Sequence, residues 1–330
     1  MSYPCAVSAQ ITNYSLQTSG KLDYNEIHKS FETVPNESRL RCYWWWLNSM
    51  ATKESITRDL EQMKANGYGG ASIVDAGSSN YTVAKKTKAG PVFMSPAWME
   101  LYKYAVKEAQ RIGIELSVNV QSGWNPGGPT ITPDLALKKL VYSETKIEGG
   151  KRVEVKLQQP ETKLLYKDIL VQAFQQSETN FPLKDKGIEF WALKSFNQGF
   201  GAQGTYPLYK LRTEYPNANE FNGLKKSNIV DLTGKFKNGV LTWDAPAGEW
   251  TVIRYGWTCT GAMTSTTSDG WSGLSMDHLN PDAFKKFSHD VIIPLIEAAR
   301  SSGNSLHFLQ TDSWEMGNVG WTNNFANDFK

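Results

Sequence analysis

Short apolar runs alternate with segments of helical periodicity in the first 140 residues of the chain. Residues 41–48, 71–75 and 115–121 are rich in apolar and β-branched residues, which predicts three buried strands. After each run, apolar residues recur three and four positions apart, as on one face of a helix. Each predicted helix begins after a residue that can cap it, and these capping residues are Thr52, Ser95 and Thr132. Repeated strand–helix units favour a parallel sheet or a barrel.

Each predicted strand ends in a polar side chain. The first three end in Asn48, Asp75 and Gln121, and a fourth apolar run at 306–309 is followed by Asp312 and Glu315. In barrels of alternating strands and helices, the carboxyl ends of the strands hold the chemistry. The recurrence therefore predicts one shared polar rim.

The periodicity changes in the middle of the chain. Alternating runs such as 153–157 and 240–243, with turn signals such as Asn238-Gly239, predict antiparallel hairpins. Helical periodicity returns after Asn280-Pro281 and ends near Gly303. The fold class is therefore α/β, a (β/α)8-type barrel interrupted by an all-β, β-sandwich-like insertion. Only four barrel-type strands are found where a closed barrel has eight, so the chain holds either a truncated barrel, which we favour, or an open sheet.

This pattern divides the chain into four parts. The first is a polar lead-in with a short helix around residues 24–31, and the second is the first part of the α/β barrel. The third is the all-β insertion, and the fourth continues the barrel. Their predicted bounds are 1–40, 41–144, 145–260 and 261–330.

Composition narrows the class of partner. The chain has 35 basic and 33 acidic residues and a net charge of +2, which gives no reason to expect nucleic acid or an anionic membrane surface. No apolar run reaches the length of a membrane span. Three distant cysteines argue against a disulfide framework and a structural zinc site. Residues 4–10 look like the end of a secretory signal, so we expect a periplasmic or extracellular protein.

The segment Asp312-Ser313-Trp314-Glu315 is the candidate catalytic centre. Glycoside hydrolysis uses two carboxylates, one of them kept protonated by its surroundings. An apolar wall such as Trp314, or the neighbouring charge of Asp312, would raise the pKa of Glu315. The alternative is a helix N-terminus, where acidic residues are favourable for electrostatic reasons alone.

Tryptophan is abundant, with 12 residues, and flat aromatic faces suit the C–H faces of sugar rings. In a strand, Trp44 and Trp46 point to one face and Trp45 to the other. One face is predicted to line a sugar site, although packing in the core is the alternative for at least one ring. Trp124 begins a glycine-rich loop, 124–129, that suits either a ligand or a tight connection. Nucleotide-binding glycine motifs are absent, so no nucleotide cofactor is expected.

Three further polar residues have open assignments. Asp75 is predicted either to bind a hydroxyl or metal at the rim or to hydrogen-bond the loop behind it. Asp277 and His278 either line the rim or cap the helix that follows at Pro281. The four histidines show no metal-ligand spacing, which argues against zinc.

Several blocks together resemble glycoside hydrolase family 106, the α-L-rhamnosidases. They span about residues 41–325 in a fairly specific order, and they are 44–48, 56–60, 63–64, 127–129, 132–133, 138–141, 241–243, 246–250 and 312–315. The resemblance implies a catalytic barrel with β insertions that removes terminal α-L-rhamnose from glycans. It also implies inversion at the anomeric carbon, with a calcium ion helping to orient the sugar hydroxyls.

In this interpretation Glu315 matches the general acid of the family, and the general base is expected beyond residue 330. The residues predicted to hold substrate are Trp44, Trp46, Asn48, Asp75, Gln121, Trp124, Asp277, His278, Asp312 and Trp314. The metal ligands stay unassigned. The alternatives are a non-catalytic carbohydrate-binding protein, an inactive fragment, or a barrel hydrolase that acts on another sugar.

Overall fold

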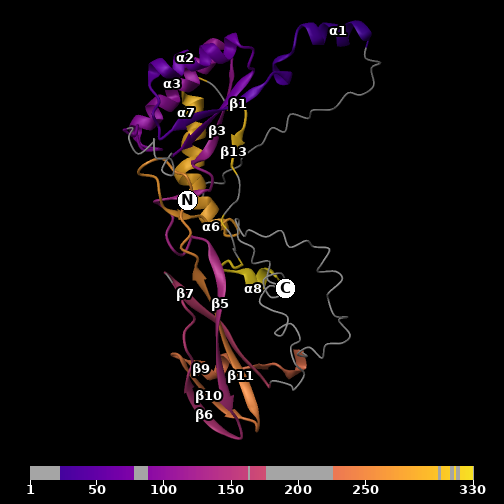
Figure 1. Cartoon of the computed structure of the whole chain (residues 1–330), viewed down its shortest axis with the longest axis vertical. Coiled ribbons are helices and arrows are strands. Elements are labelled where there is room, and N and C mark those ends of the chain that lie inside the picture. Colours follow the sequence, from indigo (N-terminus) through magenta and orange to yellow (C-terminus); the bar gives the residue numbers. More distant parts are fainter. Residues whose placement is uncertain are drawn as a thin grey trace, which may run out of the picture.

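The computed structural model describes residues 23–77, 88–162, 164–175, 226–303, 306–312, 316 and 320–329. It contains a parallel sheet flanked by helices and, further down the view, a group of antiparallel sheets (Figure 1). The signal-like segment 4–10, Trp314 and Glu315 lie outside the described residues.

The parallel sheet has the strand order β1-β2-β3-β13. Its strands are β1 (Arg41–Leu47), β2 (Gly70–Ala76), β3 (Glu115–Ser122) and β13 (Leu309–Gln310). Neighbours along the chain are neighbours in the sheet, as in barrels of strand–helix units. No closure into a barrel occurs among the described residues.

Helices follow the strands as the capping signals predict. They are α2 (Lys53–Ala65), α3 (Pro96–Ile112), α6 (Pro281–Phe287) and α7 (Ile293–Ser301). Thr52 and Ser55 form a capping box at the start of α2, and Ser95 caps α3 before its first-turn proline. The predicted helix after Asn280 also forms, but a π-helical turn at Ser288–Ile292 separates α6 from α7.

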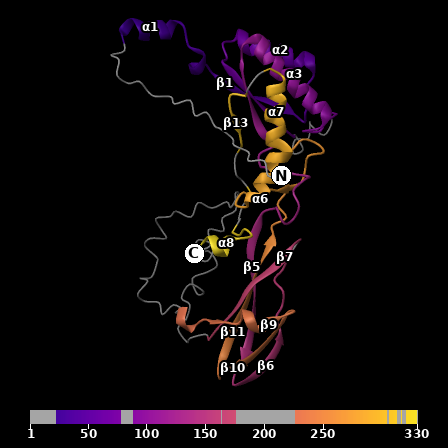
Figure 2. The same ribbon diagram turned by 180° about the vertical axis from the view of Figure 1, so that it is seen from behind.

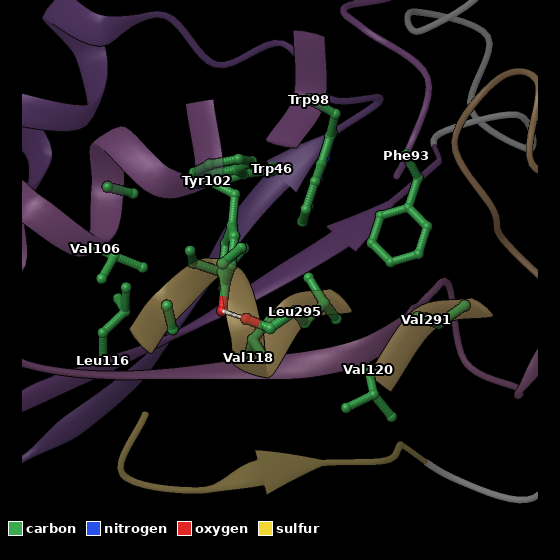
Figure 3. Packing of buried hydrophobic residues seen from close by; sticks show 14 of the residues in the cluster. Trp46, Phe93, Trp98, Tyr102, Val106, Leu116, Val118, Val120, Val291 and Leu295 are labelled. Atoms are coloured by element: carbon green, nitrogen blue, oxygen red, sulfur yellow. Dashed lines mark hydrogen bonds between the residues drawn. The ribbon is translucent and has the colours of Figure 1, made fainter. Parts of the chain in front are cut away.

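One face of the sheet forms the main core together with α2, α3 and α7. From β3, Leu116, Val118 and Val120 point toward the side of the sheet on which Val291 and Leu295 lie (Figure 3). The Tyr102 hydroxyl donates a 3.2 Å hydrogen bond to the main-chain oxygen of Leu295. Alternation along the strands turns a second set to the opposite face, which we call the polar face: Tyr43, Trp45, Ser72, Asn119, Gln121 and Gln310.

The antiparallel part is one continuous insertion between β3 and α6. One sheet has the order β5-β11-β7-β8 and a second has the order β6-β10-β9. The strands are β5 (Lys138–Glu148), β6 (Lys151–Lys156), β7 (Tyr166–Gln175), β8 (Val230–Asp231), β9 (Phe236–Lys237), β10 (Val240–Ala245) and β11 (Glu249–Cys259). A separate core that includes Trp243, Trp250 and Val252 fills the space between the sheets. Figure 2 shows the two bodies of the chain, the helix-flanked parallel sheet and the antiparallel part, from behind.

The remaining elements are short. The predicted N-terminal helix is α1 (Tyr24–Glu32), and α8 (Phe325–Asp328) lies near the C-terminus. A small ribbon pairs β4 (Gly127–Gly128) with β12 (Leu274–Ser275).

Two predictions of local structure are wrong. The helix expected after Thr132 is a turn followed by strand β5, because Ala136 bridges to Met276 and the Leu137 amide donates to the main-chain oxygen of Ser275. The apolar run before Asp312 suits a buried parallel strand, but it is not buried. Phe308 is 46 % exposed and Leu309 is 41 % exposed, since β13 is only two residues long and pairs with β3 on one side.

Candidate functional site

Asp75, at the end of β2, is the centre of a buried hydrogen-bond network. Its carboxylate accepts hydrogen bonds from the hydroxyls of Ser49 and Ser268, both at 2.6 Å, from the Trp98 indole at 3.1 Å, and from the Ser122 hydroxyl. The donors come from four different segments, so the carboxylate ties together the loops at this end of the sheet. Burial raises the pKa of Asp75, and the four hydrogen bonds oppose that shift.

A hydroxyl-rich segment, Thr264–Asp269, packs against the strand ends. The Gly77 amide donates to the main-chain oxygen of Thr266 at 2.7 Å, and the Trp124 amide donates to that of Ser265 at 3.1 Å. A Cβ on Gly77 would lie 1.8 Å from the main-chain oxygen of Thr267, so only glycine allows this approach. Sequence reasoning missed the segment, although its run of hydroxyl residues before Gly270 was a visible signal.

Asn48, at the end of β1, contacts the same segment. Its side-chain oxygen accepts from the Asp269 amide at 2.8 Å, and its side-chain nitrogen lies 3.3 Å from the Asp269 carboxylate. Asn48 and Ser49 both have positive φ, 50° and 55°, a conformation that asparagine tolerates better than most residues. The chain thus turns sharply after β1, and this turn places the Ser49 hydroxyl within hydrogen-bond distance of Asp75.

Asn119 and Gln121 organise the loop after β3. The Asn119 side-chain nitrogen donates to the main-chain oxygens of Gln121 and Gly123, and the Gln121 side-chain nitrogen donates to that of Trp124. Both residues are fully buried. Asn119 was not identified from the sequence, although it precedes Gln121 by two positions and therefore shares its face.

The three consecutive tryptophans divide between the two faces of the sheet. Trp44 and Trp46 are 6 % and 2 % exposed and belong to the helix-covered core, where the Trp44 indole donates to Asp59 at 3.2 Å. Trp45 is 41 % exposed on the polar face, and its ring meets that of Trp124 edge to face with centroids 5.3 Å apart. The described geometry thus favours Trp45, and not Trp44 or Trp46, as the ring that faces a ligand.

Asp277 forms a buried ion pair that joins the two bodies. Its carboxylate lies 3.2 Å from the ammonium of Lys138 and accepts from the Thr322 hydroxyl at 2.8 Å. Lys138 is fully buried at the start of β5 and also donates to the main-chain oxygens of Asp134 and Ala136. For the neighbouring His278, partial burial lowers the pKa, and the charge of Asp277 opposes this.

Asp312 follows β13 by two residues and is partly buried at the carboxyl end of the sheet. Asn48 and Asp312 follow β1 and β13, whereas Asp75 and Gln121 are the second-last residues of β2 and β3, so all four lie near the carboxyl ends of adjacent parallel strands. The Asp75 carboxylate accepts from Trp98 of the helix-covered core, whereas Gln121 lies on the polar face. Asp277 and His278 instead follow β12 and precede α6.

The resemblance implies a calcium ion, and its ligands stay unassigned. No group of three or more His, Cys, Asp or Glu side chains in the described part of the chain could hold a metal ion. The rim carboxylate with the most complete set of contacts, Asp75, is already surrounded by protein donors. Nor is any helix in the described ranges long and apolar enough to span a membrane.

Comparison with known proteins defines the class of this fold and site. Residues 32–330 match glycoside hydrolase family 106, the alpha-L-rhamnosidases. The fold matches the structure of a rhamnosidase from Novosphingobium sp. PP1Y with a TM-score of 0.69 and 21 % identity, over 92 % of this chain and 41 % of that one. The class is thus that of the glycoside hydrolases, and this chain belongs to family 106.

One curated relative carries a different name. A protein of Formosa agariphila named "Putative beta-glucuronidase" is 31 % identical over 313 residues, which cover 93 % of this chain. The chain spans only 25 % of that relative.

Proposed function

We propose that this chain is part of an inverting α-L-rhamnosidase that removes terminal α-L-rhamnose from glycans. The observation that carries the proposal is the polar rim of a family 106 chain: four adjacent parallel strands each lead into a polar side chain. Such a rim is where strand–helix barrels place their chemistry. We further propose, from residues 4–10, that the protein acts outside the cytoplasm.

The sheet itself supports a barrel-type architecture. Gln310 of β13 reaches the Tyr43 hydroxyl of β1 although β2 and β3 lie between them. Strands are spaced about 4.8 Å apart, so a flat sheet would separate the outer two by roughly 14 Å. A curved sheet, concave on the polar face, brings these side chains together, and we take the four strands to be part of a (β/α)8-type barrel.

In the proposed mechanism Glu315 donates a proton to the leaving glycosidic oxygen. A second carboxylate activates water on the opposite face of the sugar. Support for Glu315 comes from its position five residues after Gln310, beyond the end of β13. Asp312 precedes Glu315 by three residues in the sequence, and we propose that its carboxylate binds the sugar hydroxyls.

The name of the Formosa relative motivates a second candidate substrate, a β-glucuronide. A glucuronide carries a carboxylate, which favours a cationic partner, whereas rhamnose is a 6-deoxy sugar with a methyl group. Lys138, at the start of β5, is fully buried and paired with Asp277, whereas Trp45 presents an exposed aromatic ring. These contacts favour the deoxy sugar.

The test uses the natural protein that contains this chain. We expect it to hydrolyse aryl and alkyl α-L-rhamnosides faster than the matching β-D-glucuronides. Glu315→Gln should abolish turnover of alkyl rhamnosides, whose poor leaving groups need the acid, while aryl rhamnosides with good leaving groups keep more activity. Equal loss on both substrates would remove Glu315 from the acid role. Sugar binding without turnover by the unmodified protein would favour a carbohydrate-binding protein.

A further inference from the structure

Two buried amide oxygens lie on the polar face without a hydrogen-bond donor in the described part of the chain. They are Oδ1 of Asn119 and Oε1 of Gln121, two positions apart on β3. Both side-chain nitrogens donate to main-chain oxygens of the following loop. These bonds fix the orientation of each amide, so the unpartnered atoms are the acceptors.

A buried acceptor without a donor destabilises the folded protein. Burying a polar group without a partner costs free energy because its hydrogen bonds to water are lost, and most buried polar groups in proteins have partners. Exceptions of this kind call for a ligand or a water. A neutral amide oxygen accepts a hydrogen bond from a hydroxyl group, and two such oxygens on one strand suit two hydroxyls of one ring.

An aromatic wall accompanies these acceptors. Trp45 is exposed by 41 %, and Trp124 meets it edge to face at 5.3 Å. The Gln121 side chain donates to the main-chain oxygen of Trp124, and the Trp124 amide is held by Ser265. The side-chain amide of Gln121 therefore has two roles. Its nitrogen holds the main chain of Trp124, and its oxygen is an acceptor. Apolar rings beside hydroxyl acceptors are the combination that a deoxy sugar requires.

The geometry points to a sugar-ring position on the polar face. Trp45 and Trp124 contact the C–H side of the ring, and the oxygens of Asn119 and Gln121 each accept a hydrogen bond from a ring hydroxyl. This assignment rests on the proposed glycosidase function and names residues that determine which sugar is accepted.

The test measures kcat/KM of the natural protein for an aryl α-L-rhamnoside and for its 2-, 3- and 4-deoxy analogues. The wild type should lose at least about tenfold against one analogue. Gln121→Met should lower kcat/KM for the parent about tenfold and remove the discrimination against one deoxy position. A merely structural role of Gln121 would lower all four values in parallel, and that result overturns the assignment.

Trp45→Ala gives an independent arm, because an exposed ring is removed without opening the core. It should raise KM for the parent rhamnoside about tenfold, and Phe31→Ala, which removes a more exposed aromatic ring on α1, should leave it unaltered. Unchanged KM in Trp45→Ala overturns the aromatic wall even if Gln121→Met does not fold. Turnover by the wild type with both variants unaffected contradicts only this site. No rhamnoside turnover by the wild type contradicts the proposed function itself.

Discussion

The side-chain amide of Gln310 donates a hydrogen bond to the Tyr43 hydroxyl, which links the two outer strands of a four-stranded parallel sheet. The Ser72 hydroxyl of β2 also donates to Gln310, at 3.4 Å. These contacts lie on the polar face, opposite the helices. They place Gln310, Tyr43 and Ser72 on the face where Trp45, Asn119 and Gln121 also lie.

Because Trp45 and Trp46 lie on different faces of β1, substitutions of these two neighbours should destabilise the protein by unequal amounts. Trp46→Ala should lower the free energy of unfolding by about 3–5 kcal/mol, because it leaves a cavity in the helix-covered core. Trp45→Ala should cost less than about 1 kcal/mol, since its ring is half exposed. Denaturant unfolding of both variants measures the difference. Equal losses would mean that the two faces of β1 are wrongly assigned.

Asp75 is predicted to be a structural centre of the rim. Asp75→Ala leaves four buried donors without an acceptor and should lower the free energy of unfolding by about 3 kcal/mol. The exposed change Glu100→Gln on α3 should stay within about 0.5 kcal/mol. A loss in Asp75→Ala no larger than that of this control would contradict the network.

The raised pKa of Asp75 also predicts a pH dependence. The folded state binds the proton more tightly than the unfolded state, so this group makes the protein more stable as pH falls through the folded-state pKa toward 3.8. Asp75→Asn cannot titrate. The stability of the wild type relative to Asp75→Asn should therefore increase over this range. A difference that stays constant, or that shrinks, would show that the pKa is not raised.

The ion pair between Lys138 and Asp277 is predicted to be costly to break. Lys138→Met leaves a buried carboxylate without its cation and should lower the free energy of unfolding by about 3–5 kcal/mol. Removing both charges, in Lys138→Met with Asp277→Asn, should recover part of that loss. A double-mutant cycle measures this coupling, and strictly additive losses would argue against the pair.

Arg254 and Asp168 form the corresponding ion pair of the antiparallel part, at 2.7 Å. Arg254 is nearly buried, whereas Asp168 is 40 % exposed. Asp168→Asn should therefore cost about 2 kcal/mol, more than Arg254→Met, which leaves a carboxylate that water can reach. Desolvation raises the pKa of Asp168, but hydrogen bonds from Arg254 and Tyr166 outweigh it and lower the pKa overall.

The lowered pKa of Asp168 sets the pH range in which the stabilisation by its ion pair with Arg254 is lost. The stabilisation is present above the ordinary value of 3.8 and is lost as pH falls through the lower folded-state pKa. The difference between wild type and Asp168→Asn should narrow below pH 3.8. Persistence of the full difference in acid would contradict the role of the ionised pair.

Local signals in the sequence predicted much of the fold. The capping residues Thr52, Ser95 and Asn280 mark the observed helix starts, and the polar strand ends Asn48, Asp75 and Gln121 lie at one edge of the sheet. Thr132-Pro133 carried the same signal without a helix, because pairing of the next residues with the chain near Ser275 outweighs a local preference.

The site was less accessible to sequence reasoning. Alternation separates Trp45 from Trp44 and Trp46, but only the position of the helices decides which face is the core. The contacts between Asp75 and Ser268, and between Lys138 and Asp277, join residues that are 193 and 139 positions apart, and no local pattern encodes such pairs.

We propose that the protein containing this family 106 chain hydrolyses α-L-rhamnosides with inversion at the anomeric carbon. Proton NMR of the first sugar released from an aryl α-L-rhamnoside by the natural protein tests it most directly. With inversion, β-L-rhamnose should appear first and convert to the equilibrium mixture only later. Initial release of α-L-rhamnose, or the absence of any released rhamnose, would contradict the account.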